Sequence, residues 1–207
     1  QCALIGGLVR HLAEDKDVEV SAFVEDVAAS GGYWLACAAD TIYAQNSSII
    51  GSIGVISASF GFDSLIEKYG VSRRVHTAGR DKSFMDPFLP EKQKDISRLK
   101  DIQKAIHEDF KAWVRGRREG LLSAEDKEIF EGGFWAGQQA QELGLIDGIG
   151  LLRPVMKEKY GQDVKFLELS YDKQIVPNLL GLKSGFDWAD DAIQVIENRA
   201  HWSRFGL

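Results

Sequence analysis

The chain has 207 residues, of which 44% are hydrophobic, and a formal net charge of -6 at neutral pH. This composition is typical of one soluble globular domain with or without an appendage, and no basic stripe indicates a nucleic-acid partner. No run of about 18 apolar residues predicts a membrane span. The two cysteines, Cys2 and Cys37, have neither metal-ligand nor CxxC spacing, so we expect no metal.

The first predicted element is an amphipathic helix over residues 3–13. The sequence opens without methionine or a targeting pattern, within that helix, so we expect further sequence before Gln1. A β-branched and aromatic run over residues 18–24 then predicts a buried strand. An Ala-rich segment over residues 33–39 predicts a buried helix.

Ser30 lies between that strand and that helix, with small residues on both sides. A sharp turn of this kind leaves the hydroxyl unshielded, as in a nucleophile elbow, although the letters are not Gly-x-Ser-x-Gly. Gly31 and Gly32 let main-chain amides approach a ligand closely, and amides at a helix N-terminus favour an oxyanion. The alternative is an ordinary serine N-cap followed by two glycines.

Strands and helices alternate along the rest of the sequence. We predict strands at residues 41–44, 51–56, 74–77 and 164–169, and a strand or turn at 130–135. Helices are predicted at residues 62–69, 91–119, 123–129, 137–143, 151–160 and 186–201, the first of them closed by Gly70. The alternation indicates a layered α/β core over residues 1–160. Residues 161–207 form a predicted extension of one strand and one helix.

The long helix predicted at residues 91–119 carries an apolar stripe. The elements before residue 79 already supply the core of one α/β domain, so this stripe is additional apolar surface. The stripe consists of Ile96, Leu99, Ile102, Ile106, Phe110 and Trp113. Further apolar residues lie in the tail after residue 175. Large uncovered apolar patches mark partner surfaces, which predicts a contact between subunits.

A serine nucleophile needs a base, and Lys82 is the first candidate. Burial beside apolar side chains lets a lysine act as a general base, and the loop of Lys82 also contains Phe84, Met85 and Phe88. The alternative base is His76, on the predicted strand just before this loop.

The other histidines are His11, His107 and His201, which fall on predicted amphipathic helices. We expect these three side chains at the surface.

Four motifs occur in a specific order: Ala-Ser-Gly-Gly-Tyr at residues 29–33, Gly-Ser-Ile-Gly-Val at 51–55, Gly-Arg-Asp-Lys at 79–82, and Gly-Gln-Gln-Ala with Leu-Gly-Leu-Ile-Asp at 137–147. In this order and spacing the chain resembles the signal peptide peptidase A family, whose members are serine/lysine-dyad peptidases with a ClpP/crotonase-like fold. The resemblance covers about residues 20–150, nearly two-thirds of the chain.

The resemblance implies a role for each matching residue. Ser30 matches the nucleophile, Lys82 the general base, and Ser52 the hydroxyl that orients the lysine. The amide of Gly31 matches one oxyanion donor. The family's Ser-Pro-Gly-Gly loop, which supplies the other oxyanion donor, has no counterpart in this sequence, and we expect it upstream of Gln1.

The strand that contains Gly51, Ile53 and Gly54 resembles a wall of the family's substrate groove. The resemblance implies an endopeptidase without a cofactor that degrades membrane-derived peptides such as cleaved signal peptides. It also implies a cyclic homo-oligomer whose subunits share the sites. Membrane association is then expected through parts outside this chain, on the extracytoplasmic side, while this chain is itself soluble.

Two alternative functions remain open. A crotonase-type acyl-CoA enzyme has the same fold and paired oxyanion amides but needs no dyad, and the presence of Ser30 and Lys82 argues against it. A non-catalytic scaffold that binds peptides would keep the fold without the reaction.

Overall fold

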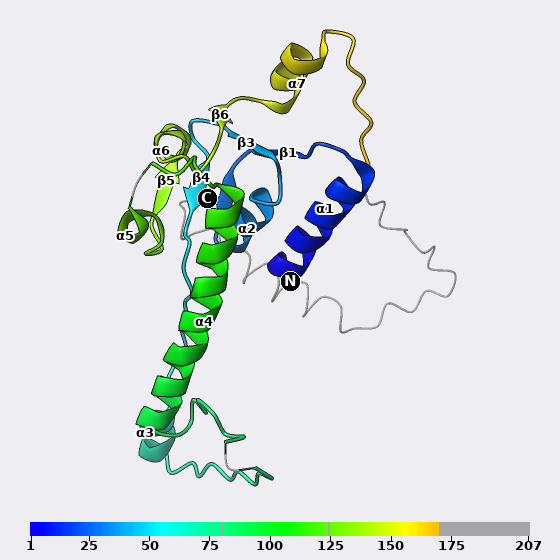
Figure 1. Ribbon diagram of the computed structural model, residues 1–207. Helices are drawn as coiled ribbons and strands as arrows, with labels where there is room; N and C mark the ends of the chain where they lie inside the picture. The colour runs from blue at the N-terminus through cyan, green and yellow to red at the C-terminus, as the bar shows by residue number, and fades with distance from the viewer. Residues whose placement is uncertain (80, 124, 170–207) are drawn as a thin grey trace, which may run out of the picture. The chain divides into compact units, whose positions relative to one another are not determined.

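The computed structural model describes residues 1–79, 81–123 and 125–169 of the chain. The chain divides into two units, residues 1–155 and residues 156–207, and the strands among the described residues belong to the first unit. The tail segment after residue 175 and the helix predicted at 186–201 lie outside the described residues. Figure 1 labels the elements in chain order.

The described residues form two three-stranded sheets in the first unit (Figure 1). In one sheet, β3 (Thr41–Ala44) lies between β1 (Ser21–Val24) and β6 (Gly148–Ile149), and both pairings are parallel. In the other sheet, β4 (Ile49–Gly51) pairs in parallel with β2 (Val27–Ala29) and antiparallel with β5 (Phe134–Ala136). Parallel strands joined through helices confirm the predicted layered α/β class.

The helices agree closely with the sequence pattern. α1 (Cys2–Lys16), α2 (Gly31–Ala36), α3 (Asp63–Lys68) and α4 (Gln93–Arg117) overlap the first four predicted helices. α6 (Gly137–Glu142) and α7 (Leu152–Tyr160) do the same later in the chain, whereas α5 (Asp126–Ile129) is shorter than predicted. Gly70 has φ 65°, as expected of a glycine that ends a helix.

Several strand predictions are wrong. The run predicted as one strand at residues 18–24 gives only β1, and the chain then enters the other sheet as β2, immediately before Ser30. β4 ends at Gly51, where the predicted strand begins. Residues 74–77 and 164–169 form no strand, and among the described residues no strand lies beside them to pair with. β5 begins at Phe134 rather than at residue 130.

The C-terminal end of α4 packs against α2. Phe110 and Val114 join the core, and the indole nitrogen of Trp113 donates to the main-chain oxygen of Trp34 over 2.9 Å. Arg117 donates to the main-chain oxygens of Cys37 and Ala39, each over 2.9 Å, just beyond the end of α2. Carbonyls at a helix C-terminus lack intrahelical donors, and the helix dipole is negative there. A guanidinium at this end therefore supplies hydrogen bonds and also a favourable positive charge. The helix that begins after Ser30 is therefore fixed at its far end.

An ion pair from a buried arginine anchors the Leu-Gly-Leu-Ile-Asp motif. Arg118 is only 2% exposed and bonds to Asp147 over 2.8 Å and to the main-chain oxygen of Gly144 over 2.9 Å. The hydroxyl of Tyr33, on α2, donates to the main-chain oxygen of Leu145 over 2.7 Å. Burial raises the pKa of Tyr33 well above its usual value, so the hydroxyl remains a donor. The motif thus holds α2 in place through its hydrogen bond with Tyr33.

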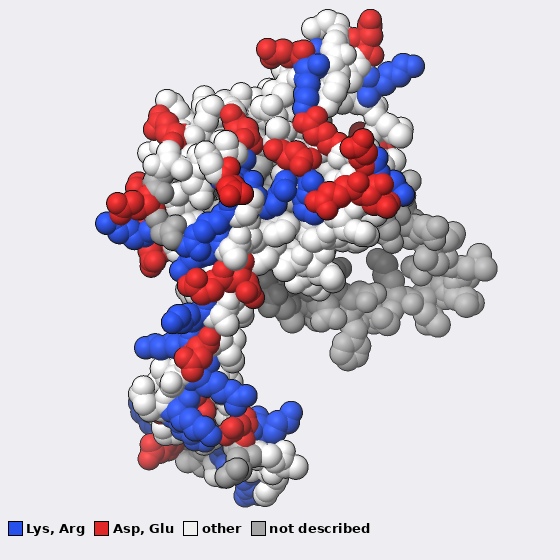
Figure 2. Space-filling model, viewed as in Figure 1, with Lys and Arg blue, Asp and Glu red and all other residues white. Residues whose placement is uncertain are grey.

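The N-terminal half of α4 is mostly exposed. Ile102 and Ile106, two members of the predicted apolar stripe, are 45% and 48% exposed, whereas Phe110 is buried. On the face shown in Figure 2, acidic and basic side chains are interspersed along this helix. Within the described part of the chain, no helix combines the length and apolar character needed to cross a bilayer.

Candidate active site

Ser30 lies at the predicted strand-to-helix turn, between the last residue of β2 and the first of α2. The residue is exposed and has φ 51° and ψ -119°. Such a backbone costs a non-glycine residue about 1–3 kcal/mol and persists only where surrounding contacts determine it. Here the N–H of Ser30 donates to the main-chain oxygen of Gly51 over 2.8 Å, and its own oxygen accepts from Trp34 over 3.0 Å. The turn (residues 29–31, the Ser30 turn) thus has a backbone fixed by hydrogen bonds and leaves Ser30 exposed.

Gly31 is the first residue of α2 and lies against the start of α1. A Cβ at this position would be 2.6 Å from the Sγ of Cys2, so no larger residue fits without movement. The first N–H groups of a helix have no acceptor within the helix, which leaves them free to meet an anion. The role of the Gly31 amide as an oxyanion donor stays a prediction.

The segment that follows β4 is tightly held (residues 51–53, the Ser52 segment). Gly51 has φ 116°, and a Cβ there would be 2.8 Å from both the oxygen of Gly133 and the ring of Trp135. Ser52 has φ 52°, and its N–H donates to the oxygen of Gly133 over 2.6 Å. Because Gly51 also accepts from Ser30, the structure brings the predicted nucleophile and the predicted lysine-orienting serine onto adjacent backbone.

The predicted groove wall is only partly exposed. The side chain of Ile53 is fully buried and belongs to the core, so it does not face a substrate in this chain. Gly54 is half-buried, and a Cβ there would be 3.3 Å from the Cα of Gly132. Main-chain atoms, rather than the side chain of Ile53, are what this segment can offer to a peptide.

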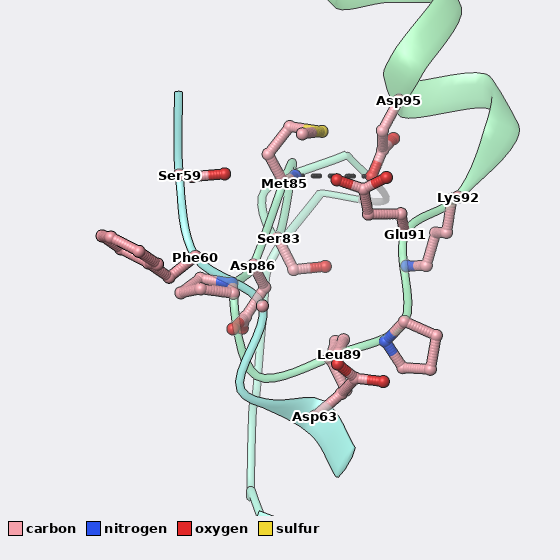
Figure 3. Close-up of a pocket in the computed structure, with 13 residues that line it drawn as sticks. Ser59, Phe60, Asp63, Ser83, Met85, Asp86, Leu89, Glu91, Lys92 and Asp95 are labelled. Atoms are coloured by element: carbon pink, nitrogen blue, oxygen red, sulfur yellow. Dashed lines mark hydrogen bonds between the residues drawn. The ribbon is translucent and has the colours of Figure 1, made fainter. Parts of the chain in front are cut away.

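Lys82 lies in a different environment, in the turn at residues 81–85 (the Lys82 turn). Asp81 pairs with Lys94 over 2.9 Å and with Arg98 over 3.4 Å, and the hydrogen bond from Lys94 lowers the pKa of Asp81 below its usual value. The N–H of Met85 donates to Asp95 over 3.4 Å (Figure 3). These contacts attach the turn to the first part of α4. Lys82 itself is exposed, so its apolar neighbours do not bury it as the sequence suggested.

The Lys82 turn and α2 are attached to different parts of α4. The Lys82 turn contacts this helix between Lys94 and Arg98, whereas α2 contacts it from Phe110 onward. An α-helix rises about 1.5 Å per residue, so these attachment points lie roughly 18 Å or more apart along the helix. In the part of the chain that the structure describes, no hydrogen bond joins Ser30 to Lys82, and the backbone N–H of each bonds to a different segment.

A pocket of about 250 Å³ adjoins the Lys82 turn (Figure 3). Its walls include the carboxylates of Asp63, Asp86, Glu91 and Asp95. The backbone N–H of Phe88 and the Arg73 guanidinium hold the pKa of Asp86 below its usual range. Ser30 does not line this pocket. Among the described residues, no group of three or more potential metal ligands is placed to bind a metal ion.

The histidines differ from one another in their surroundings. His76, the alternative base, is exposed and lies in the same stretch as the Lys82 turn. His107 was expected at the surface, which is wrong: it is half-buried, and its Nε2 lies 3.2 Å from the main-chain oxygen of Ile53. Its partner is 54 residues away in the sequence, so no local pattern indicates this contact. His201 lies outside the described residues.

The family model of peptidase family S49 matches residues 12–164, more than half of the chain. The chain belongs to peptidase family S49. The match includes Ser30, Ser52 and Lys82, and it confirms the resemblance to signal peptide peptidase A at the level of the family.

Two relatives and one solved structure illustrate the similarity. This S49 chain is 45% identical to a Brucella abortus protein named Na(+)/H(+) antiporter NhaA, over 100% of the chain but 30% of that protein. It is 31% identical to the chloroplastic serine protease SPPA of Arabidopsis thaliana, over 83% of the chain and 26% of that protein. A solved enoyl-CoA hydratase/isomerase family member is 18% identical over 70% of the chain and 36% of that structure, with a TM-score of 0.34.

Proposed function

We propose that this S49 chain is the nucleophile- and base-bearing part of a serine endopeptidase. Ser30 attacks a peptide carbonyl while Lys82 accepts the hydroxyl proton, and the leaving amine departs as it takes up a proton. Water then hydrolyses the acyl-enzyme on the Oγ of Ser30. The observation that carries the proposal is the Ser30 turn itself, where an exposed serine is held at positive φ beside the first amides of α2.

We further propose that the dyad forms between subunits of a cyclic homo-oligomer. Asp81, next to Lys82, is attached near the start of α4, whereas the helix that follows Ser30 packs near its end, and a second chain would supply the missing partner. Exposed apolar side chains support such an assembly: Ile56 is 77% exposed, Phe60 79% and Ile106 48%. Head-to-tail contacts of one surface with another close into rings when the rotation allows.

The proposed substrates are extended, membrane-derived peptides such as cleaved signal peptides. Family membership supports this class, and a shared interior would exclude folded proteins. Membrane association is proposed to come from parts of the protein outside this chain. The antiporter name of the Brucella relative does not favour transport here, because 70% of that protein lies outside the aligned region and the S49 match lies inside it.

A labelling experiment tests the nucleophile. A fluorophosphonate probe is expected to modify Ser30 in the full-length protein and to leave a Ser30→Ala variant unlabelled. Absence of labelling in an intact protein would favour the non-catalytic scaffold.

A mixing experiment tests the shared site. Ser30→Ala and Lys82→Ala subunits, each inactive alone, are expected to recover peptidase activity when they are dissociated and reassembled together. A dyad within one chain predicts no recovery, since neither subunit then contains both groups.

A further inference from the structure

His107 lies on α4 and contacts the Ser52 segment. Its Nε2 atom is 3.2 Å from the main-chain oxygen of Ile53. A carbonyl oxygen can only accept a hydrogen bond, so Nε2 carries the hydrogen in this contact. Because Ile53 is fully buried and His107 half-buried, an unpaired oxygen here would lack water to replace the donor.

This contact is the last of three that fix successive residues. The oxygen of Gly51 accepts from Ser30 over 2.8 Å, and the N–H of Ser52 donates to Gly133 over 2.6 Å. The oxygen of Ile53 then bonds to His107. Ser52 lies between the outer two with φ 52°, a left-handed backbone that serine keeps only when its neighbours enforce it. The three bonds together fix the backbone from which the Ser52 hydroxyl extends.

His107 lies on α4 between the two regions of this helix that contact other parts of the proposed site. From Phe110 onward the helix packs on the core and on α2, whereas between Lys94 and Arg98 it holds the Lys82 turn. His107 lies between these two stretches and reaches the segment that carries the predicted lysine-orienting serine. One helix therefore contacts the Lys82 turn, the Ser52 segment and the helix that follows Ser30.

We propose that His107 is a positioning residue, which acts through Ile53 on the backbone of Ser52 and thereby on the adjacent Ser30 turn. Its effect on turnover rests on the proposed peptidase function, whereas the hydrogen bond does not. Without the donor, the Ile53 oxygen must move to find another partner, and Ser52 moves with it. A displacement of about 1 Å can lower a catalytic rate by about a hundredfold.

The test compares two substitutions of similar length, His107→Gln and His107→Met, in the full-length protein. Glutamine carries an N–H that can reach the Ile53 oxygen, whereas methionine fills similar space and favours a helix equally but has no donor. We expect kcat of His107→Gln to stay within about threefold of the parent, and that of His107→Met to fall about tenfold or more with KM changed less than about threefold. His11→Met, on the exposed surface of α1, is the control and should change neither constant.

A second readout is independent of peptidase activity. In ¹H–¹⁵N spectra of the labelled chain, the amide resonances of Ser52 and Ser30 should shift in His107→Met and remain near the parent positions in His107→Gln and His11→Met. If the parent cleaves no peptide, the proposed function fails, while the amide shifts still decide whether His107 positions Ser52. Should His107→Met not fold, His107→Leu replaces it as the donor-free variant. Equal kcat in the donor and donor-free variants, or an unmoved Ser52 amide in the latter, overturns the inference.

Discussion

The Ser30 turn and the Lys82 turn carry the two halves of one proposed dyad but are held by different kinds of contact. Main-chain hydrogen bonds to Gly51 and Trp34 fix Ser30, and the surrounding residues belong to the core. Lys82 is attached through side-chain ion pairs of Asp81, which lie at the surface. Surface ion pairs contribute about 0–1 kcal/mol each, so the second attachment is much weaker than the first.

This difference indicates how the site is assembled. A backbone in an unfavourable conformation, such as that of Ser30, has to be formed when the chain folds, because the core enforces it. A turn held by exposed ion pairs can adjust when a neighbouring subunit arrives. In the proposed assembly, the backbone of Ser30 is therefore set within one chain, whereas the Lys82 turn would acquire its final environment from a second subunit.

The largest expected effect concerns the base. Lys82→Ala should lower peptidase turnover by about a thousandfold or more in the full-length protein while its circular dichroism spectrum and melting temperature stay unchanged. Lys82→Arg should be nearly as damaging, because a guanidinium stays protonated and cannot accept the proton. Substantial turnover in either variant would discard the dyad and make His76 the candidate base.

Two glycines test the difference in rigidity directly. Gly51→Ala should destabilise the protein by about 2–6 kcal/mol, the sum of a strained φ and a clash with Gly133 and Trp135. Gly79→Ala, next to the Lys82 turn at φ 104°, has the strain but meets only Lys82 Cγ at 3.4 Å, and should cost about 1–3 kcal/mol. Urea unfolding of both variants measures the two costs. Equal losses would show that both regions are held alike.

Ser52 is the proposed link between the two halves of the site. Ser52→Ala should lower kcat by about tenfold and change KM little, because the role proposed for its hydroxyl is to orient the lysine and not to bind the peptide. The melting temperature should change little, since the backbone bond to Gly133 remains. Steady-state kinetics with a peptide substrate measure the split. Unchanged turnover would reduce Ser52 to a structural residue of the segment.

The smallest expected effects are on stability as a function of pH. Partial burial by itself raises the pKa of Asp40, but the Val20 N–H and the Arg10 and Arg117 guanidinium groups outweigh it and lower the pKa below 3.8. A carboxyl with a depressed pKa stabilises the fold above its unfolded value and loses that contribution as the pH falls through the folded pKa. Asp40→Asn should therefore lower the melting temperature by about 2–6 °C at pH 7, and the difference from the parent should shrink below about pH 4.

Asp81→Asn is the matched variant on the weaker side. The pKa of Asp81 is also lowered, chiefly by its bond to Lys94, but the side chain is exposed. Solvent screens such pairs, so its melting temperature should stay within about 1 °C of the parent. Thermal melts from pH 3 to pH 7 compare both variants. A larger decrease in melting temperature for Asp81→Asn than for Asp40→Asn would show that the Lys82 turn is held more firmly than the region around α2.

Local sequence signals predicted the parts of the fold that local interactions determine. Three features could be predicted because each depends on neighbours within a few residues. They are the capping glycine at position 70, the apolar period of α4 and the strand at residues 41–44. The division of one apolar run into β1 and β2 was not, since two sheets have to be present before the chain can pass from one to the other. Residues 74–77 have the alternating side-chain pattern of a strand, but this pattern does not show whether a neighbouring strand is present to pair with.

The candidate site was predictable as a set of motifs but not as an arrangement. Small residues around Ser30 indicated a sharp turn, and its positive φ agrees with that. The apolar residues next to Lys82 suggested burial, yet sequence neighbours did not cover it. The contact of His107 with Ile53 spans 54 residues and leaves no local trace, so only the folded chain reveals it.

The side chain of Cys2, at the start of α1, packs against Gly31 next to the Ser30 turn. The Sγ of Cys2 borders the position that a Gly31 side chain would occupy, and the residue is half-buried. The second cysteine of the sequence, Cys37, is buried, and desolvation raises its pKa to about 12, so it is inert to alkylating dyes. Cys2 is the more exposed of these two thiols, and any group attached to its sulfur would press on Gly31 and so disturb the Ser30 turn.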